Sequence, residues 1–597
     1  MKPWACGDVL AGEERPFFLS RGQHALAVMH HATSAPRGVV VLAGPMTLER
    51  SHGYLTWVRW ARTLAHNGYE VFRFDASGVG ESTGDFHTRT FDAWRDDLDA
   101  VVSHARHRGP VTVIGLRLGA LLGAKLFEAG RCDAFVAWEP PAGGRQMLME
   151  MLRRKLAADL MELSGERRSR EEYVKRLEGG ELVEVEGYEW SRGLWQSAAA
   201  FEFVAPKSER SLVLHLDGRD GVRIPKPVFW GQSNVLVPEL GELFERTCAF
   251  LDGLSLGPVT AAPPEADLTS RTPGAVAQTT RELELLEGCV GTAHRPAERT
   301  SRLGLLWVNF GYVPRDGHGG LATQVCDVMA AHGVPGFRFD LPGLGDTPGP
   351  LLPDTQQFYP FVTSGGFAPI VARLVERLCE REQLDGLIFA GLCGGAINAI
   401  YAGDAEPARV KGLVLLEPEL YTTEPNKSGP EAPRQRLRDR LRERLPPQLP
   451  LVDALLAKHL PFEDQLRAKL FSYWGWMRLL THENRYARYL PLPRKAILDF
   501  VLHRSELPAV TNLPLAHAWQ RWVMAQRPVL TITAKGKLRE VFFDRINEKV
   551  LSGVTRRNYE HARLENTNHI FTSGGAIATV TAHIERAWPM LTATAPV

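Results

Sequence analysis

Short apolar runs alternate with longer amphipathic stretches along most of the chain. Near the start, the runs "GVVVLAG", "YEVFRFD" and "VTVIGL" are separated by "YLTWVRWARTLAHNG" and "FDAWRDDLDAVVSHARH". In the two longer stretches the apolar positions recur at helical spacing. Short continuous apolar runs between helices are typical of parallel strands that are buried on both faces. The pattern therefore predicts an α/β fold, with a mostly parallel sheet flanked by helices.

This pattern is written twice. The segments 69–84 ("YEVFRFDASGVGESTG") and 334–349 ("VPGFRFDLPGLGDTPG") share the sequence FRFDxxGxG, followed by an acid, Ser or Thr, any residue and Gly. Each is followed by a Gly-x-x-x-Gly turn, in "VIGLRLGALLGAK" and "IFAGLCGGAINAI", and then by an apolar run that ends in Glu-Pro. The offsets are nearly constant, since Asp75 and Asp340 are 265 positions apart and Glu139 and Glu417 are 278 apart. A repeat of this length predicts two tandem copies of a whole domain.

We expect a first domain at 1–254, a linker at 255–280 and a second domain at 281–597. The linker segment is rich in Pro, Ala, Thr and Gly and offers little to bury. Each copy also carries a helical insertion before its last strands, at 145–178 and at about 430–517. The aromatic, Met and Leu positions of these insertions either line a substrate pocket or pack on the domain below.

Charge and cysteine content narrow the class of protein. The formal net charge is +1, which gives no concentrated basic surface for nucleic acid. The run "RQRLRDRLRERL" is interrupted by acids at helical spacing and is typical of a solvated helix face. Seven scattered cysteines without a CxxC pair argue against a disulfide framework or a zinc knuckle. The chain has no signal-peptide core and no run of about 18 apolar residues, so we expect a cytoplasmic protein with no membrane span. We also expect no metal and no cofactor.

The second Gly-x-x-x-Gly turn has the pattern of a nucleophile elbow. A strand, a sharp turn of the form Gly-x-nucleophile-x-Gly and a helix hold the nucleophile in a strained conformation that only small neighbours permit. In "GLCGG" the central residue is Cys393, with Gly391 before it and Gly394 and Gly395 after it. Cys393 is therefore the candidate nucleophile, and the backbone N–H of Gly394 is a candidate oxyanion donor.

With these motifs the chain resembles the α/β-hydrolase superfamily over both copies. The first copy resembles bacterial hydrolases found with exosortase systems, through "FRFDASGVGESTG" and "AWEPPAGGR". The resemblance implies two tandem α/β-hydrolase domains, each with a helical cap insertion. It also implies an elbow nucleophile, a general-base histidine after the last strand, and an acid on an intervening loop.

The second copy supplies most of this catalytic set. His569 stands on a polar loop before the C-terminal helix, where the superfamily keeps its base. For the acid we favour Glu540, after the strand "RPVLTITA", with Asp544 and Glu417 as alternatives. A Cys–His pair depends less on this acid, because a thiol can form an ion pair with imidazolium.

The loop "VNFGYVPRDGHGG" follows an early strand of the second copy. By position, Phe310 and Gly311 are the remaining candidate oxyanion donors. Arg315 and His318 in the same loop either meet a polar substrate group or are exposed loop residues, and we favour exposure for His318.

The first copy lacks the nucleophile and base. Arg117 occupies its elbow and cannot attack a carbonyl, because a guanidinium stays protonated. Gln232 or Ser233 stands where the histidine is expected, although Asp217 and Asp220 remain near the acid position. We expect Arg117 to pair with Glu139 from the neighbouring strand end, and the first copy to be a pseudo-hydrolase domain.

The leading hypothesis is therefore an acyl hydrolase or acyltransferase that acts on an ester or thioester through an acyl-cysteine intermediate. Its partner is a small-molecule or carrier-bound acyl substrate, and the oligomeric state is open. The rival is a non-catalytic tandem binding or scaffold protein, in which Cys393 only fills the elbow. Lyase chemistry on the same scaffold is a third possibility, because a fold does not dictate a reaction.

Overall fold

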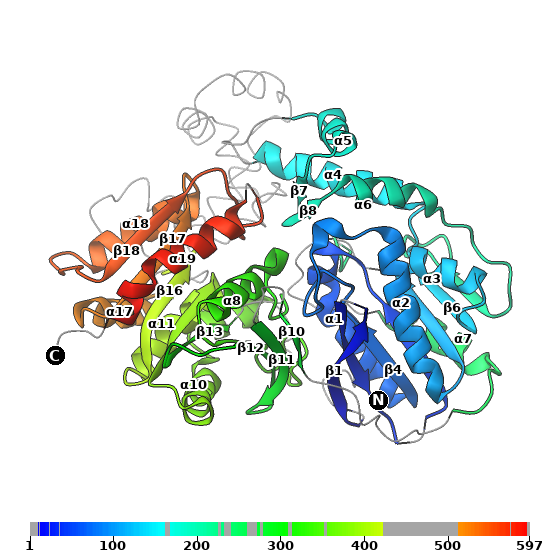
Figure 1. Cartoon of the computed structure of the whole chain (residues 1–597), viewed down its shortest axis with the longest axis horizontal. Coiled ribbons are helices and arrows are strands. Elements are labelled where there is room, and N and C mark those ends of the chain that lie inside the picture. Colours follow the sequence, from blue (N-terminus) through cyan, green and yellow to red (C-terminus); the bar gives the residue numbers. More distant parts are fainter. Residues whose placement is uncertain are drawn as a thin grey trace, which may run out of the picture.

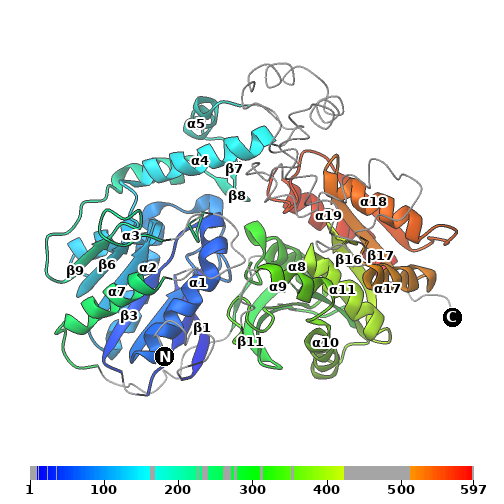
Figure 2. The ribbon, with the colours of Figure 1, turned by 180° about the vertical axis from the view of Figure 1, so that it is seen from behind.

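The computed structural model describes residues 10, 12–22, 24–34, 36–161, 168–224, 228–231, 240–259, 271–274, 279–308, 313–350, 355–421, 511–573 and 575–593. Two sheets lie side by side, each flanked by helices (Figures 1 and 2). We call residues 10–259 the N-terminal half and residues 271–593 the C-terminal half. The α/β fold class predicted from the apolar pattern is confirmed.

The N-terminal half is built on a mixed sheet. Within the described residues its strand order is β1-β2-β4-β3-β5-β6-β9, antiparallel from β1 to β4 and parallel from β4 to β9. The strands are β1 (Glu14–Arg21), β2 (His24–His31), β3 (Gly38–Ala43), β4 (Tyr69–Phe74), β5 (Val111–Leu116), β6 (Ala134–Trp138) and β9 (Ser211–Leu214). The helices of its two faces are α1 (Thr47–His66), α2 (Phe91–Ala105), α3 (Leu118–Glu128) and α7 (Gly241–Gly253).

The predicted insertion of this half is a separate layer over the sheet edge (Figure 1). It consists of helices and a hairpin: α4 (Gly144–Met161), α5 (Arg170–Gly179), β7 (Val183–Val185), β8 (Tyr188–Trp190) and α6 (Arg192–Ser197). Its apolar side chains, among them Met147, Met151 and Trp190, belong to the core cluster that also contains α2 and α3. In this half the insertion therefore packs on the domain below.

The C-terminal half repeats this strand order from β11 to β17 and adds one strand at each edge, β10 and β18. Within the described residues the order is β10-β11-β12-β14-β13-β15-β16-β17-β18, and the pairs from β14 to β18 are parallel. The strands are β10 (Arg271–Pro273), β11 (Thr279–Leu286), β12 (Cys289–Pro296), β13 (Leu303–Val308), β14 (Gly336–Phe339), β15 (Gly386–Leu392), β16 (Val410–Leu416), β17 (Val529–Ala534) and β18 (Tyr559–Leu564). The helices are α8 (Leu321–Ala331), α9 (Thr355–Thr363), α10 (Ala368–Glu382), α11 (Gly394–Ala405), α17 (Leu513–Met524), α18 (Leu538–Val550) and α19 (Ala576–Thr592).

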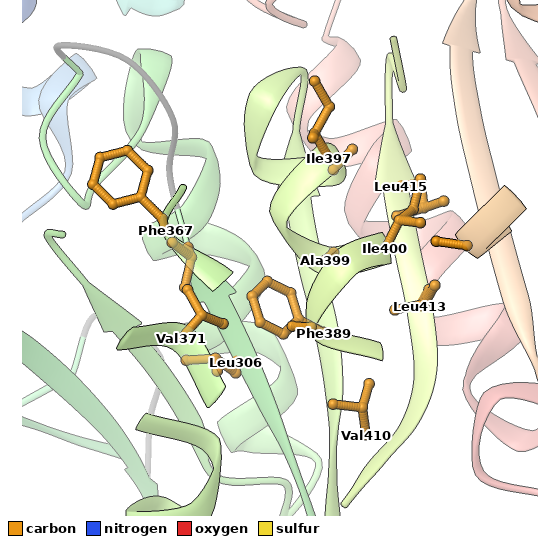
Figure 3. Close-up of a cluster of buried hydrophobic side chains, with 14 of the residues drawn as sticks. Leu306, Phe367, Val371, Phe389, Ile397, Ala399, Ile400, Val410, Leu413 and Leu415 are labelled. Atoms are coloured by element: carbon orange, nitrogen blue, oxygen red, sulfur yellow. The ribbon is translucent and has the colours of Figure 1, made fainter. Parts of the chain in front are cut away.

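Alternate strand residues fill two cores, one on each face of this sheet. Leu306 and Phe389 pack with α10 and α11 on one face, as Figure 3 shows. Leu305 and Ile388, one position away, pack with α8 and α19 on the other face. Burial on both faces explains why these strands are continuously apolar rather than alternating.

The predicted boundaries stay predictions, with one local difference. Residues 271–273, inside the predicted linker, form strand β10, which pairs with β11. The linker residues 260–270 and most of the second insertion, 430–510, lie outside the described residues. The common origin of the two halves also remains a prediction.

The two halves meet through ion pairs that are exchanged between the two copies of the FRFD motif. Arg73 donates to Asp346 of the other half at 2.7 Å, and Arg338 donates to both oxygens of Glu81 at 2.9 and 2.7 Å. These four residues stand at equal positions of the two motifs, and all four are buried. The acid of each motif therefore neutralises the arginine of the other.

The surrounding contacts follow the same approximate two-fold relation. Arg73 and Arg338 each donate Nε–H to a buried histidine of their own half, His31 at 2.9 Å and His294 at 2.8 Å. Arg315, for which the sequence left contact with a substrate group open, is buried at this interface between Asp340, Asp346 and Glu81. In both pictures α1 and β1 of the N-terminal half face α8 and β11 of the C-terminal half (Figures 1 and 2).

Candidate active site

Cys393 stands between the end of β15 and the start of α11, as the elbow pattern predicts. Its backbone has φ 55° and ψ −114°, a region that non-glycine residues rarely adopt. A Cβ at Gly391 would lie 2.4 Å from the carbonyl carbon of Gly395, so the turn requires glycine there. The Cys393 N–H donates to Leu416 of the neighbouring strand at 2.8 Å, which fixes the turn at the carboxyl ends of the parallel strands.

His569 lies on the loop between β18 and α19, and its side chain lies close to the elbow. One ring nitrogen of His569, Cys393 Sγ and a carboxylate oxygen of Glu419 all lie within 4.8 Å of one another. The fold thus brings the two principal predicted residues together, although 176 positions separate them. Their catalytic roles remain a proposal.

The carboxylate that contacts His569 is Glu417, not Glu540. His569 Nδ1 lies 3.4 Å from Glu417 Oε2, and Glu417 also accepts the N–H of Ala534. The carboxylate of Glu540 instead accepts the N–H of Gly536 at 2.6 Å and pairs with Arg563 at 3.0 Å. Asp544 also pairs with Arg563 at 3.0 Å. The geometry therefore favours Glu417, the alternative at the end of β16, over Glu540 as the partner of the imidazole.

Arg539, which the sequence did not single out, lies at the centre of the site. Its Nη1 atom is 2.8 Å from His569 Nε2 and 3.8 Å from Cys393 Sγ, and it pairs with Glu419. Nη1 also lies 3.4 Å from His569 Nδ1. Because a guanidinium can only donate, we assign the acceptor to the nearer Nε2, which puts the remaining ring proton of a neutral His569 on Nδ1, facing Glu417. This is the tautomer that a general base needs, but the guanidinium occupies the lone pair that would receive the thiol proton.

Burial sets the protonation states of the resting site. It raises the pKa of the Cys393 thiol well above its usual range, and the Glu419 carboxylate raises it further. Burial, and then the Arg539 cation, lower the pKa of His569 to about 3. Burial raises the pKa of Glu417 to about 7. At pH 7 the thiol and the imidazole are therefore both neutral in this conformation.

The three side chains around the elbow could in principle hold a metal ion. Thiolate, imidazole and carboxylate are zinc ligands, and Cys393, His569 and Glu419 supply one of each. In the described structure, however, Nη1 of Arg539 contacts all three side chains and places a permanent positive charge among them. The Arg539 guanidinium therefore takes the central place among these three side chains that a metal ion would take.

Of the predicted oxyanion donors, Gly394 is the first residue of α11, and its N–H is directed at the Cys393 sulfur. Phe310 and Gly311 lie outside the described residues. His318 is half-buried rather than exposed, and desolvation lowers its pKa to about 4. The expectation of an exposed loop histidine is wrong.

The elbow of the N-terminal half keeps the same backbone with a different side chain. Arg117 has φ 56° and ψ −111°, nearly the values of Cys393. Its guanidinium pairs with Glu150 of α4 at 2.7 Å and with Glu49 of α1 at 3.4 Å. The expected pair with Glu139 is wrong, because the Glu139 carboxylate accepts the N–H of Leu216.

Arg117 thus links the elbow of the N-terminal half to helix α4 of the insertion. Arg154 of α4 joins the same cluster through Glu49 at 3.0 Å and Glu186 at 2.9 Å. Asp220 accepts from His215, and Asp217 pairs with Arg219, so both retained acids are engaged locally. Gln232 and Ser233 lie outside the described residues. The pseudo-hydrolase label remains a prediction.

Part of the chain matches the sequence model of a known protein family. Residues 34–170 match the family model described as serine aminopeptidase, S33. This match, the strand order and the elbows agree with the α/β-hydrolase fold that the sequence resembles. The matched residues lie in the N-terminal half. No curated protein matches the chain.

Solved structures similar to the chain include TT1662 from Thermus thermophilus, at 16% identity, with 53% of this chain and 99% of that one covered and a TM-score of 0.30. The thioesterase domain from the curacin biosynthetic pathway has 15% identity, the same coverages and a TM-score of 0.28. An α-β serine hydrolase homologue from Coxiella burnetii has 23% identity, covering 22% of this chain and 65% of that one, with a TM-score of 0.19. A search of the described helices finds none long and apolar enough to cross a membrane.

Proposed function

We propose that this chain is an acyl hydrolase or acyltransferase whose nucleophile is Cys393. One observation carries the proposal: a thiol sits in the strained elbow conformation within 4.8 Å of an imidazole whose far nitrogen faces a carboxylate. Nucleophile, base and orienting acid in this relation are what acyl transfer requires.

The reaction begins when His569 Nε2, released from Arg539, takes the Cys393 proton. The sulfur then bonds to the ester or thioester carbonyl carbon, and the Gly394 N–H supports the oxyanion. The imidazolium gives its proton to the leaving alcohol or thiol as the carbon–oxygen or carbon–sulfur bond breaks. Water, or an alcohol or amine acceptor, then attacks the acyl-cysteine with His569 as the base, and the thiol re-forms. The roles of Glu417 and Glu419 are to stabilise the imidazolium and to hold Arg539.

The experiment is intact-protein mass spectrometry after incubation with panels of p-nitrophenyl esters and acyl thioesters. We expect one acyl mass on the wild type, none on Cys393→Ala, and turnover lost in Cys393→Ala and His569→Ala. Cys379→Ala is the control, because Cys379 is also a free thiol but is buried on α10, away from the elbow. Equal turnover in all four proteins would eliminate Cys393 as the nucleophile.

A scaffold role is the second candidate, and a specific observation supports it. Arg539 lies between the thiol and the imidazole, and the elbow of the N-terminal half is filled by its own ion pairs. If no ester or thioester in the panel acylates the wild type, we would reject the enzyme hypothesis in favour of a scaffold role.

A further inference from the structure

A single nitrogen of Arg539, Nη1, makes all of its contacts with the other site residues. Nη1 meets Glu419, His569 and the Cys393 sulfur. Nε and Nη2 make no hydrogen bond with any residue in the described part of the chain, and a quarter of the side chain is exposed. The planar Nε–Nη2 edge is the face of a guanidinium that binds a carboxylate with two parallel hydrogen bonds.

The inner contacts hold this open edge in a defined place. Glu419 is the paired carboxylate, and its side chain is only 12% exposed, so it fixes Nη1 from below. Burial, opposed by Glu419 and other nearby acids, leaves Arg539 with a pKa well above its ordinary value, so the charge is permanent. A fixed, permanently charged donor edge that no described residue pairs with, next to a nucleophile, is a recognition element for an anion.

We propose that Arg539 binds a carboxylate on the acyl part of the substrate, close to the carbonyl that Cys393 attacks. This inference rests on the proposed function. With Nη1 3.8 Å from the sulfur, a carboxylate on the outer edge lies within about 8 Å of it, given ordinary hydrogen-bond lengths. An acyl chain with two or three methylene groups between carbonyl and carboxylate spans that separation. The substrate class is therefore a monoester or monothioester of a short dicarboxylic acid.

The same contact relieves the obstruction in the resting site. While Nη1 donates to His569 Nε2, that nitrogen cannot accept the thiol proton. A carboxylate on the outer edge offsets part of the Arg539 charge that faces His569, and this weakens the contact between Nη1 and Nε2. Binding of the correct acyl group thereby frees the base, and a neutral acyl group lacks this effect.

Two matched esters test the specificity: p-nitrophenyl butyrate and the mono-p-nitrophenyl ester of succinic acid. The wild type is expected to prefer the anionic ester by about ten- to a hundredfold in kcat/KM, the range of a hydrogen-bonded charged pair. Arg539→Met is expected to abolish this preference, and Arg539→Lys, which keeps the charge without the fork, to retain part of it. Arg521→Met is the control, because Arg521 pairs with Asp404 on the exposed surface. Equal kcat/KM for the two esters in the wild type, or an unchanged preference in Arg539→Met, overturns the proposal.

A binding measurement separates this inference from the proposed chemistry. In Cys393→Ala, calorimetry with monomethyl glutarate is expected to show binding that Cys393→Ala/Arg539→Met loses. Methyl phosphate serves as the second arm, and tighter binding of it than of the carboxylate would overturn the assignment of a dicarboxylate. If the ligand binds through Arg539 but no ester is turned over, the proposed reaction fails while the anion site stands. If neither variant binds it, the anion site fails.

Discussion

Removing Glu81 tests whether the exchanged ion pairs join the two halves. The Arg338 side chain is 0% exposed, and its two terminal nitrogens lie 2.9 and 2.7 Å from the Glu81 oxygens. Arg315 lies 3.2 Å from the same carboxylate. Glu81→Ala therefore leaves Arg338 buried without its bidentate partner and weakens the neutralisation of Arg315.

The expected cost follows from this geometry. Two unit charges about 4 Å apart interact by about 4 kcal/mol at an effective dielectric of about 20. Removing one partner of a buried pair typically costs about 3–5 kcal/mol, because the other charge stays buried. We expect Glu81→Ala to fall in this range and to lower the Tm by at least about 5 °C. The exposed pair Arg302–Asp385 is the control, and Asp385→Ala is expected to cost less than about 1 kcal/mol.

Calorimetric unfolding of the single variants and of the double variant Glu81→Leu/Arg338→Met measures the coupling. The double variant is expected to recover most of the loss, because apolar replacement of both partners removes the unpaired charge. The pKa of Glu81 is lowered despite its burial, since Arg338 and Arg315 favour the carboxylate. Its contribution is therefore present above about pH 4.5 and is lost as the pH falls through the lower folded value. A loss below 1 kcal/mol at pH 7, or no recovery in the double variant, would refute the interface argument.

Three further outcomes follow from the elbows and their partners. Arg117→Met is expected to cost about 1–3 kcal/mol in thermal unfolding, because Glu49 keeps only Arg154, and to leave ester turnover unchanged; a loss of turnover equal to that of Cys393→Ala would contradict the pseudo-domain prediction. In pH profiles, kcat/KM is expected to rise with pH through about 7 as Glu417 ionises and stabilises the imidazolium, whereas Glu417→Gln gives a lower, flat profile; an unaltered limb in that variant would assign it elsewhere. Gly391→Ala is expected to cost about 1–3 kcal/mol and most of the activity, since its Cβ meets the backbone of Gly395, while Gly253→Ala, with nothing within 4 Å of its Cβ, is the neutral control; equal stability of the two variants would show that the elbow tolerates a side chain.

Local pattern was enough to predict the fold and the principal pair of the candidate site. Continuous apolar runs between helices predicted parallel strands, and both faces of those strands are buried. The elbow glycines pointed to Cys393, and the resemblance to the superfamily pointed to His569 on the polar loop before the last helix. Both signals are local, because a turn and a helix start are determined by neighbouring residues.

The remaining site residues depend on long-range contacts that no local pattern records. Glu540 follows the expected strand, but its carboxylate is taken by Gly536 and Arg563, and Glu417 reaches the imidazole instead. Arg539 stands one residue from Glu540 in the stretch searched for an acid, and only the fold shows that it meets Cys393. The repeated FRFD motif was visible as a repeat, but the sequence does not show that its charges cross between the halves.

The crossed arrangement has a consequence for how this gene can change. Because each motif's acid pairs with the opposite arginine, deleting the N-terminal half would remove Glu81 and leave Arg338 without its bidentate partner. A substitution at one of these charged positions is therefore expected to need a compensating substitution in the other half, 257 or 273 positions away in the sequence.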